Sequence, residues 1–180
     1  MIAPYGEKNV RLAAIEDAAA IAHVHVESSR AAYRQIYPQS WLSRKSVEDR
    51  ALFWKQMLTA ADPRSVICVA CDEAQGVVGF LAGGEERTGR LGCDAELHAI
   101  YLLPAAQRRG LGTLLVRRFV AELGGLGLAS MAVWVLARNP ATKFYEALGG
   151  AVIDQQEMER GGESFVKIAY GWSDLSNIRA

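Results

Sequence analysis

Cysteine, net charge and long apolar runs are all scarce in this chain of 180 residues. Its three cysteines are too few, and odd in number, for a disulfide framework, which favours a reducing compartment. Twenty Lys and Arg residues balance twenty Asp and Glu residues, so no overall charge draws the chain to nucleic acid or to an anionic membrane. No apolar run approaches the roughly 18 residues of a membrane helix, and residues 1–8 lack the apolar core of a secretory signal. These absences predict a cytoplasmic protein whose partners include neither nucleic acid nor a membrane.

One cysteine motif is present, the C-x-x-C formed by Cys68 and Cys71. It falls in a strand-like run over residues 65–71, where side chains three positions apart point to opposite faces of a sheet. A single metal ion would not easily reach both thiols, and no second pair of ligands follows. We interpret these cysteines as buried structural thiols, with metal or redox chemistry as the less favoured alternative.

The remaining composition is that of one globular domain. Hydrophobic residues make up 51% and charged residues 22% of the chain, both near the globular average. Its length corresponds to about one domain of typical size, and no internal repeat, low-complexity tract or linker interrupts it. We therefore expect a single domain over residues 1–180.

Apolar periodicity and turn residues predict a mixed order of strands and helices. Strands are expected at residues 10–12, 66–71, 77–82, 95–103, 130–137, 151–154 and 164–170. Helices are expected at residues 15–33, from 46 to the Asp62–Pro63 pair, from near Gly110 to Gly124, and between Asn139 and Gly149. A polar loop over residues 155–163 would join the last two strands. Because strands and helices are interspersed in this way, one mixed sheet covered by helices is the expected packing.

A strand-to-helix turn within residues 100–113 carries the first chemical signal. Arg108 and Arg109 precede Gly110 and Gly112 where the strand gives way to a helix. Amides at a helix start carry partial positive charge, and glycine lets an anion approach the backbone closely, so the turn predicts a phosphate cradle. Two nucleotide-binding motifs are incomplete here. The lysine that a P-loop requires is absent, and Leu115 stands where the dinucleotide-binding motif G-x-G-x-x-G has its third glycine.

The spacing Gln107-x-x-Gly110-x-Gly112 resembles the acyl-CoA signature Q/R-x-x-G-x-G/A of the GNAT superfamily of N-acetyltransferases. Just before it, Leu102-x-Pro104 is similar to the V-x-P that ends the fourth strand in that family. The predicted order of elements also matches the family over most of the chain. Two features in the right order are far more specific than the glycine turn alone.

A second segment extends the resemblance. Asn139 is followed by Phe144-Tyr145 and then by Leu148-Gly149, similar to the family's Asn…Phe-Tyr…Leu-Gly-Phe segment. There are two departures: Thr142 stands where the family pattern has Ala, and Gly150 stands where the family usually has that last Phe. We expect the loss of that aromatic residue to alter packing near the sixth strand more than the chemistry.

This resemblance implies an α/β (α+β) fold, GNAT-like. Its single mixed, mostly antiparallel central sheet would have six to seven strands, flanked by about four helices, with splayed fourth and fifth strands. In the family, the pantetheine arm of acetyl-CoA lies in that gap like an added strand. The implied activity is an acetyl-CoA-dependent N-acetyltransferase, in which a primary amine attacks directly through a tetrahedral intermediate. Homodimers are common in such families.

The resemblance also assigns cofactor contacts. Backbone amides from Arg108 to Thr113 would bind the pyrophosphate, and Gln107 would help to position their loop. The Leu102 amide would donate to the thioester carbonyl, and Asn139 would contact pantetheine or act only as a helix N-cap. The full implied set is Ile100, Tyr101, Leu102, Gln107, Arg108, Arg109, Gly110, Leu111, Gly112, Thr113, Asn139 and Tyr145.

Glu96, His98 and Tyr145 are the candidates for proton transfer. A lysine-like amine has a pKa of about 10.4, so a base or desolvation must assist its deprotonation. Glu96 lies eleven residues before Gln107, where histone-acetyltransferase-like members have their base; a surface carboxylate is the alternative. His98 shares that face of the strand and would relay a proton, shape the pocket or serve only the structure. Tyr145 matches the tyrosine that protonates the leaving thiolate, the alternative being a core tyrosine.

The acceptor site is expected among the first two helices, the fourth strand and the last hairpin. Tyr33 and Tyr37 would line an amine pocket there, beside Glu96 and His98, unless core packing explains them. A small-molecule amine, which we favour, and a protein N-terminus or lysine remain alternatives. A non-catalytic acyl-CoA-binding regulatory domain is the alternative of another class, and it would dispense with Glu96 and Tyr145. No metal is expected.

Overall fold

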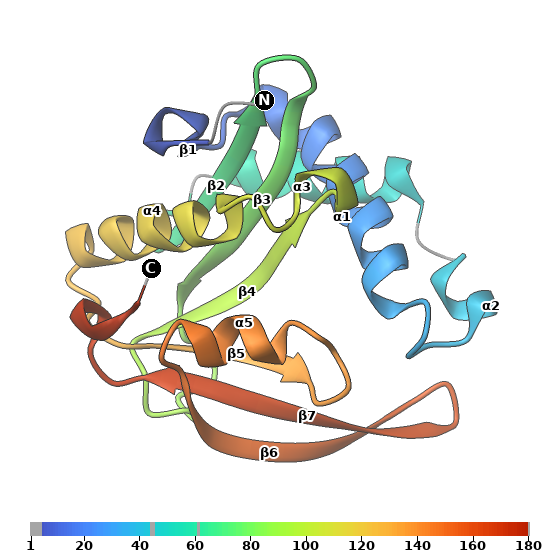
Figure 1. The fold of residues 1–180 in the computed structure, drawn as a ribbon, viewed down its shortest axis with the longest axis vertical. Coiled ribbons are helices and arrows are strands. Elements are labelled where there is room, and N and C mark those ends of the chain that lie inside the picture. The colour runs from blue at the N-terminus through green and yellow to red at the C-terminus, as the bar shows by residue number, and fades with distance from the viewer. Residues whose placement is uncertain (1–4, 44–45, 61, 180) are drawn as a thin grey trace.

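A seven-stranded sheet forms the centre of the computed structural model, which describes residues 5–43, 46–60 and 62–179 (Figure 1). In sheet order the strands are β1 (Val10–Leu12), β2 (Ser65–Asp72), β3 (Gly76–Glu85), β4 (Ala95–Leu102), β5 (Met131–Leu136), β7 (Glu163–Trp172) and β6 (Ala151–Arg160). Neighbouring strands are antiparallel except β4 and β5, which are parallel. The predicted mixed, mostly antiparallel sheet is confirmed.

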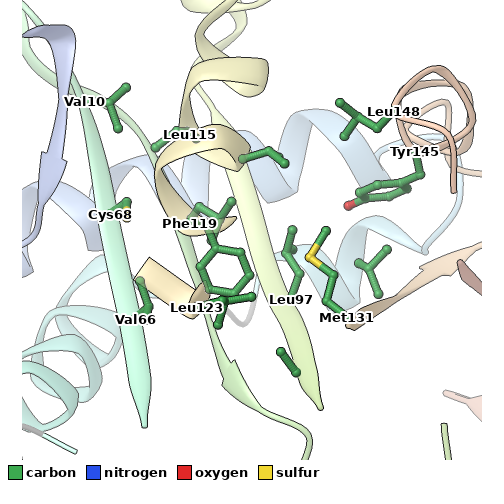
Figure 2. Packing of buried hydrophobic residues seen from close by; sticks show 14 of the residues in the cluster. Val10, Val66, Cys68, Leu97, Leu115, Phe119, Leu123, Met131, Tyr145 and Leu148 are labelled. Carbon is green, nitrogen blue, oxygen red and sulfur yellow. The ribbon is translucent and has the colours of Figure 1, made fainter. Parts of the chain in front are cut away.

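Helices cover both faces of this sheet. They are α1 (Ala18–Tyr33), α2 (Gln39–Leu42), α3 (Val47–Ala60), α4 (Leu111–Gly125) and α5 (Thr142–Ala147). On one face, Leu115 and Phe119 of α4 belong to the larger core cluster, which includes residues of β1 to β5 (Figure 2). On the other face, Ile21 of α1 and Trp54 of α3 pack against β2 and β3. The one-turn α2 was not expected; among the described helices, none is both long and apolar enough to cross a membrane.

The two faces separate the C-x-x-C pair. Cys68 is fully buried in the cluster under α4, whereas Cys71 packs against the cluster of α1 and α3. Burial raises the pKa of the Cys68 thiol to about 12. The two thiols thus face opposite sides of β2, as their spacing predicts, and Cys68 stays protonated at neutral pH.

β4 and β5 part soon after they begin to pair. Their parallel ladder joins Ala95–Leu97 to Met131–Val133, and both strands then continue without each other, to Leu102 and to Leu136. Figure 1 shows β4 and β5 diverging. The sheet therefore consists of two halves, β1–β4 and β5–β7–β6, joined along a short seam, and the predicted splay is confirmed.

The last two strands form a longer hairpin than the sequence predicts. β6 continues to Arg160 and β7 begins at Glu163, so the polar loop expected over residues 155–163 is wrong. The turn consists of Gly161 and Gly162, whose φ angles of 64° and 81° suit a two-residue hairpin. β6 is a sheet edge with mostly exposed side chains, so polar residues are compatible with a strand there.

Trp172 fills the space beside Gly150, where the resemblance leads one to expect an aromatic residue. A Cβ built on Gly150 would lie 2.7 Å from the Trp172 ring. The indole nitrogen of Trp172 donates to the Leu148 carbonyl at 3.0 Å, which fixes the ring in place. An aromatic side chain from β7 thus packs where a side chain at position 150 would lie.

Candidate active site

A cleft of about 940 Å³ opens where β4 and β5 diverge. Its lining comes from the second half of α1, from β4 and β5 beyond their shared ladder, from the turn before α4, and from α5 with the segment before it. This volume falls within the range of small-molecule and cofactor sites, about 300–1,000 Å³. Side chains therefore do not refill the gap that the splayed strands leave.

The free edge of β4 offers hydrogen-bond donors to this cleft. The Leu103 amide donates to the Val78 carbonyl of β3 at 2.9 Å, so Leu103 faces β3. Amides alternate along a strand, and those of Leu102 and Ile100 therefore face the side that β5 has left. Nε2 of Gln107 donates to the Leu102 carbonyl at 3.0 Å, which ties this edge to the turn that follows. An extended ligand with amide groups can pair here like an added strand.

The turn before α4 is suited to an anion. Gly110 (φ 85°) and Arg108 (φ 61°) adopt left-handed backbone, and no side chain caps the first amides of α4. Free amides and the positive end of the helix dipole attract negative charge. Gly112 lies in the first turn, where an added Cβ would come within 3.3 Å of the Phe144 ring. The glycines thus keep this backbone open to the cleft, which Arg108, Gly110, Gly112 and Thr113 all line.

Arg109 and Leu111 are directed elsewhere. The Arg109 guanidinium carbon lies 4.2 Å from the centre of the Tyr5 ring, and the Tyr5 hydroxyl donates to Asp72 at 2.6 Å. The Leu111 side chain is fully buried in the core. Neither residue is among the described residues that line the cleft, so only their backbone amides are available to the cradle.

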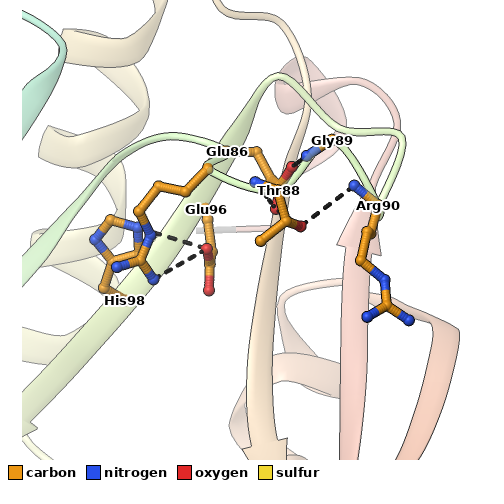
Figure 3. A network of polar contacts seen from close by, with 7 residues as sticks. Glu86, Thr88, Gly89, Arg90, Glu96 and His98 are labelled. Atoms are coloured by element: carbon orange, nitrogen blue, oxygen red, sulfur yellow. Dashed lines mark hydrogen bonds and ion pairs between the residues drawn. The ribbon is translucent and has the colours of Figure 1, made fainter.

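Glu96 and His98 come together at the inner end of the cleft. Oε2 of Glu96 lies 3.6 Å from Nε2 of His98 and 3.3 Å from a terminal nitrogen of Arg87 (Figure 3). Glu96 is 8% exposed and is not part of the described cleft lining, whereas His98 lines the cleft directly. The His98 imidazole therefore borders the cleft, and the Glu96 carboxylate contacts it from outside the lining.

Burial lowers the pKa of His98 below its ordinary value, and the positive charge of Arg87 lowers it further. The carboxylates of Glu96 and Glu86 act in the opposite direction. Arg87 belongs to the loop between β3 and β4, which Glu86 stabilises by accepting from the Thr88 hydroxyl at 2.6 Å and from the Gly89 amide (Figure 3). At neutral pH His98 is thus an uncharged imidazole that can accept a proton.

Tyr145 lines the cleft from α5. It is 5% exposed, and Figure 2 shows its hydroxyl directed towards β4. Burial raises the pKa of this phenol well above its ordinary value, and the nearby Tyr33 raises it further. The hydroxyl therefore keeps its proton and can donate a hydrogen bond into the cleft.

A model described as the acetyltransferase (GNAT) family matches residues 27–150, a range that contains every described residue lining the cleft. The chain belongs to the GNAT family. It is therefore an acyltransferase, as its motifs predict.

Relatives of this GNAT enzyme match it over most of its length. The protein described as uncharacterized N-acetyltransferase YuaI, from Bacillus subtilis (strain 168), is 35% identical over 170 residues, 94% of this chain and 95% of its own. The structure of PaiA N-acetyltransferase from Thermoplasma acidophilum in complex with coenzyme A has a TM-score of 0.68 at 19% identity, covering 88% of this chain and 96% of its own. YncA from Salmonella typhimurium, with its cofactor acetyl-CoA, gives 0.68 at 21% identity and 92% coverage of both chains. These structures share the GNAT fold.

Of the two tyrosines expected in the acceptor pocket, one lines the cleft. Tyr33 does so, and its hydroxyl lies 3.3 Å from that of Tyr101. Tyr37 is 6% exposed and is not among the described lining residues. Its ring centre lies 4.9 Å from those of Trp41 and Phe165, so it joins the segment after α1 to the hairpin. In the GNAT enzyme Tyr37 therefore packs behind Tyr33, with their ring centres 5.4 Å apart, and does not face the cleft.

Asn139 shapes the entrance to α5. It is 9% exposed, lines the cleft, and accepts from the Ala141 amide at 2.9 Å. Because α5 begins only at Thr142, this bond closes the turn before the helix. The side-chain NH₂ group of Asn139 is a second polar group at this side of the cleft.

The cysteines offer no activated nucleophile. Among the described lining residues none is a cysteine. Burial raises the pKa of the Cys93 thiol, as do the charges of Asp94 and Glu86, whereas a nucleophilic thiol needs a lowered pKa. No cysteine of the described cleft lining is therefore available as a nucleophile, and burial raises the pKa of Cys68 and Cys71 as well.

One contributor was missed in the sequence. Arg87 sits in an irregular loop that matches no motif. Its role comes from its contact with Glu96 and from its charge, which lowers the pKa of His98.

Proposed function

We propose that this GNAT enzyme transfers the acetyl group of acetyl-CoA to the primary amine of a small molecule, with residues 1–180 as one N-acetyltransferase domain. The observation that carries the proposal is the gap beside β4, with the amides of Ile100 and Leu102 along it and the Gly110 turn at its end. The PaiA and YncA structures, with the same fold, are described with coenzyme A and acetyl-CoA.

The residues of the cleft fit this cosubstrate. The free edge of β4 suits the two amides of pantetheine, and the start of α4 with Arg108 suits the pyrophosphate. Arg138 and Asn139 border the same cleft near α5 and add polar groups there. Acetyl-CoA supplies the thioester carbon at which the new C–N bond forms as the C–S bond breaks.

His98 and Glu96 receive the proton of the amine. Glu96 Oε2 lies near His98 Nε2, so the carboxylate favours the tautomer that carries its proton on Nε2. Nδ1 is then the atom that accepts a proton from the ammonium, directly or through water, and the neutral amine that results attacks the thioester. Glu96 holds the ring and stabilises the imidazolium that results.

Donors on either side stabilise the charges that develop. The amides of Ile100 and Leu102 face the cleft and can donate to the acyl oxygen as it gains negative charge. The Tyr145 hydroxyl donates to the sulfur as it leaves. One proton of the ammonium thus passes to His98 before attack. A second proton leaves the nitrogen as the C–N bond is completed, and it replaces the proton that Tyr145 gives to the departing sulfur.

The hairpin favours a small acceptor over a protein segment. Arg160 of β6 lies 4.2 Å over the Trp41 ring and donates to the Tyr37 hydroxyl at 3.4 Å. These contacts, together with those of Phe165, tie the tip of the hairpin to Tyr37 and to α2. A protein N-terminus or lysine would have to enter past this junction. The presence of His98 and Tyr145 in the cleft disfavours a purely regulatory acyl-CoA-binding domain.

Replacing Arg87 by Gln is expected to move the acid limb of the kcat/KM profile to higher pH. The guanidinium lowers the pKa of His98, so its removal raises that pKa, and the base is then lost at a higher pH as the solution is acidified. The profile is measured by thiol release at several pH values. Arg90→Gln, an exposed arginine in the same loop, is the control and leaves the limb unchanged. A limb that stays in place in Arg87→Gln contradicts the role of His98.

Thermal unfolding with acetyl-CoA, and with NAD and ATP as controls, tests the cofactor. At 100 times Kd a ligand adds about 2.7 kcal/mol, which for a domain of this size raises Tm by about 5–10 °C. We expect this rise with acetyl-CoA alone. No rise, in a protein that melts cooperatively, overturns the proposed function.

A matched pair of variants tests the cradle in the same assay. Arg108→Gln removes a cation that lines the cleft, whereas Arg109→Gln removes one that stacks on Tyr5. We expect the acetyl-CoA-dependent rise in Tm to shrink in the first variant and to persist in the second, each measured against its own ligand-free Tm. Equal effects would contradict the assignment of Arg108 to the cradle.

A further inference from the structure

Ser28 carries a buried hydroxyl that has no partner. The residue is 2% exposed, and its Oγ makes no hydrogen bond, alone among the buried side-chain polar atoms of the described residues. Ser29, next to it on α1, is equally buried, but its hydroxyl donates to the Val26 carbonyl at 3.1 Å. Ser28 lines the cleft. An unsatisfied buried hydroxyl is destabilising, so its presence at this place indicates a ligand that supplies the missing partner.

Small side chains on α1 make room for such a ligand. Ile21 and Val24, in the first half of the helix, pack tightly against the sheet. In the second half, Ser28, Ala31 and Ala32 line the cleft instead. The helix therefore leaves a chamber on its own side of β4, which His98 and Tyr101 border from the strand.

The charges around the cleft have one sign. Its ionised lining residues are Arg34, Arg108 and Arg138, and among the described lining residues there is no Asp or Glu. Arg108 belongs to the cradle before α4, on the sheet face that α4 covers. Arg34 ends α1, on the opposite face, and no ion pair is described for it. Arg34 is thus a cation on the α1 side of the sheet, separate from the phosphate cradle before α4.

We propose that the Ser28 hydroxyl and the Arg34 guanidinium bind a carboxylate of the acceptor, which is therefore a small amine of the amino-acid type. This rests on the proposed function and names its acceptor class. Both groups donate hydrogen bonds, and a carboxylate accepts several at once. Its amine then lies on the side of His98. A polyamine would meet arginines and find no carboxylate in the lining.

Matched pairs of amines that differ by one carboxylate test the class of acceptor. Suitable pairs are L-leucine with 3-methylbutylamine and L-phenylalanine with 2-phenylethylamine, assayed by thiol release from acetyl-CoA. We expect kcat/KM for the amino acid to exceed that for the plain amine by about tenfold or more, because charge-assisted hydrogen bonds are the strong ones. Equal rates, a preference for the plain amines, or no acetylation of either set by enzyme that binds acetyl-CoA would overturn the proposal.

Serine variants test the subsite itself. Ser28→Ala is expected to reduce the preference for the amino acid about tenfold, mainly through KM, while changing kcat/KM for the plain amine by less than about twofold. Its Tm should equal or exceed that of the wild type, because the hydroxyl has no partner to lose. Ser29→Ala is the matched control: it removes a satisfied hydroxyl, lowers Tm and keeps the preference. An unchanged preference in Ser28→Ala would remove Ser28 from the site.

Arginine variants separate this subsite from the cradle. Arg34→Gln should also reduce the preference, whereas Arg117→Gln, an exposed arginine on α4, should not. The rise in Tm with acetyl-CoA should persist in Arg34→Gln. Loss of that rise would assign Arg34 to acetyl-CoA and overturn its acceptor role. Absence of the rise in the wild type would instead be a failure of the proposed function itself.

Discussion

Replacing Tyr145 by Phe is expected to lower kcat about 100-fold while acetyl-CoA binding stays within about twofold of the wild type. The hydroxyl lines the cleft and forms no hydrogen bond that is described with the protein, so the substitution removes the proposed donor to the leaving sulfur and little else. Burial raises the pKa of this phenol, so it remains a donor throughout the neutral range. The measurements are thiol release at saturating substrates and the acetyl-CoA-dependent rise in Tm.

Tyr170→Phe is the control for this change. The Tyr170 ring lies 5.9 Å from that of Tyr145, but its hydroxyl donates to Glu146 at 2.8 Å and is not part of the described cleft lining. This variant should lose stability and keep its kcat. A Tyr145→Phe enzyme with wild-type kcat would remove Tyr145 from the mechanism.

His98→Gln is expected to lower kcat/KM at pH 7 about 100-fold and to abolish the acid limb of its pH profile. The pKa of His98 lies below the ordinary histidine value, so the proposed base is uncharged at pH 7, and the wild-type rate is expected to fall as the pH drops through that lowered pKa. Without the imidazole this fall disappears. His23→Gln, an exposed histidine on α1, should leave both the rate and the profile intact.

Glu96→Gln tests whether His98 or Glu96 is the general base. The Glu96 carboxylate raises the pKa of His98, so its removal should move the acid limb to lower pH. We expect a smaller loss of kcat/KM than in His98→Gln, about tenfold, because the imidazole remains. If instead Glu96→Gln is the less active variant and His98→Gln keeps its acid limb, the base is Glu96.

Backbone signals in the sequence were sufficient for most of the fold. Gly110 and Gly112 mark the turn before α4, whereas the divergence of β4 from β5 was expected only from the resemblance to the GNAT family. The hairpin was underestimated because residues 155–160 lack the alternation of a half-buried strand. They form a strand nonetheless, since an edge beside β7 needs backbone pairing more than apolar side chains.

Side-chain directions at the site could not be predicted in the same way. Arg108 and Arg109 are equivalent in sequence, yet one lines the cleft and the other stacks on Tyr5, more than 100 positions away. Tyr33 and Tyr37 were both expected to line the amine pocket, but Tyr37 packs against Phe165 of the hairpin instead. Such choices depend on contacts between segments distant along the chain, which local spacing does not contain.

The short β4–β5 seam between the two half-sheets is a place where the ligand-free enzyme is expected to be susceptible to proteolysis. Three residue pairs join β4 to β5, and beyond them the edges that the two strands turn towards each other have no partner strand. An extended thioester ligand would bridge that line and stabilise the folded state by mass action. Depletion of the acyl donor then leaves a molecule that opens most readily along this line, where proteases act. Acetyl-CoA is therefore expected to slow proteolysis of the folded enzyme along this line.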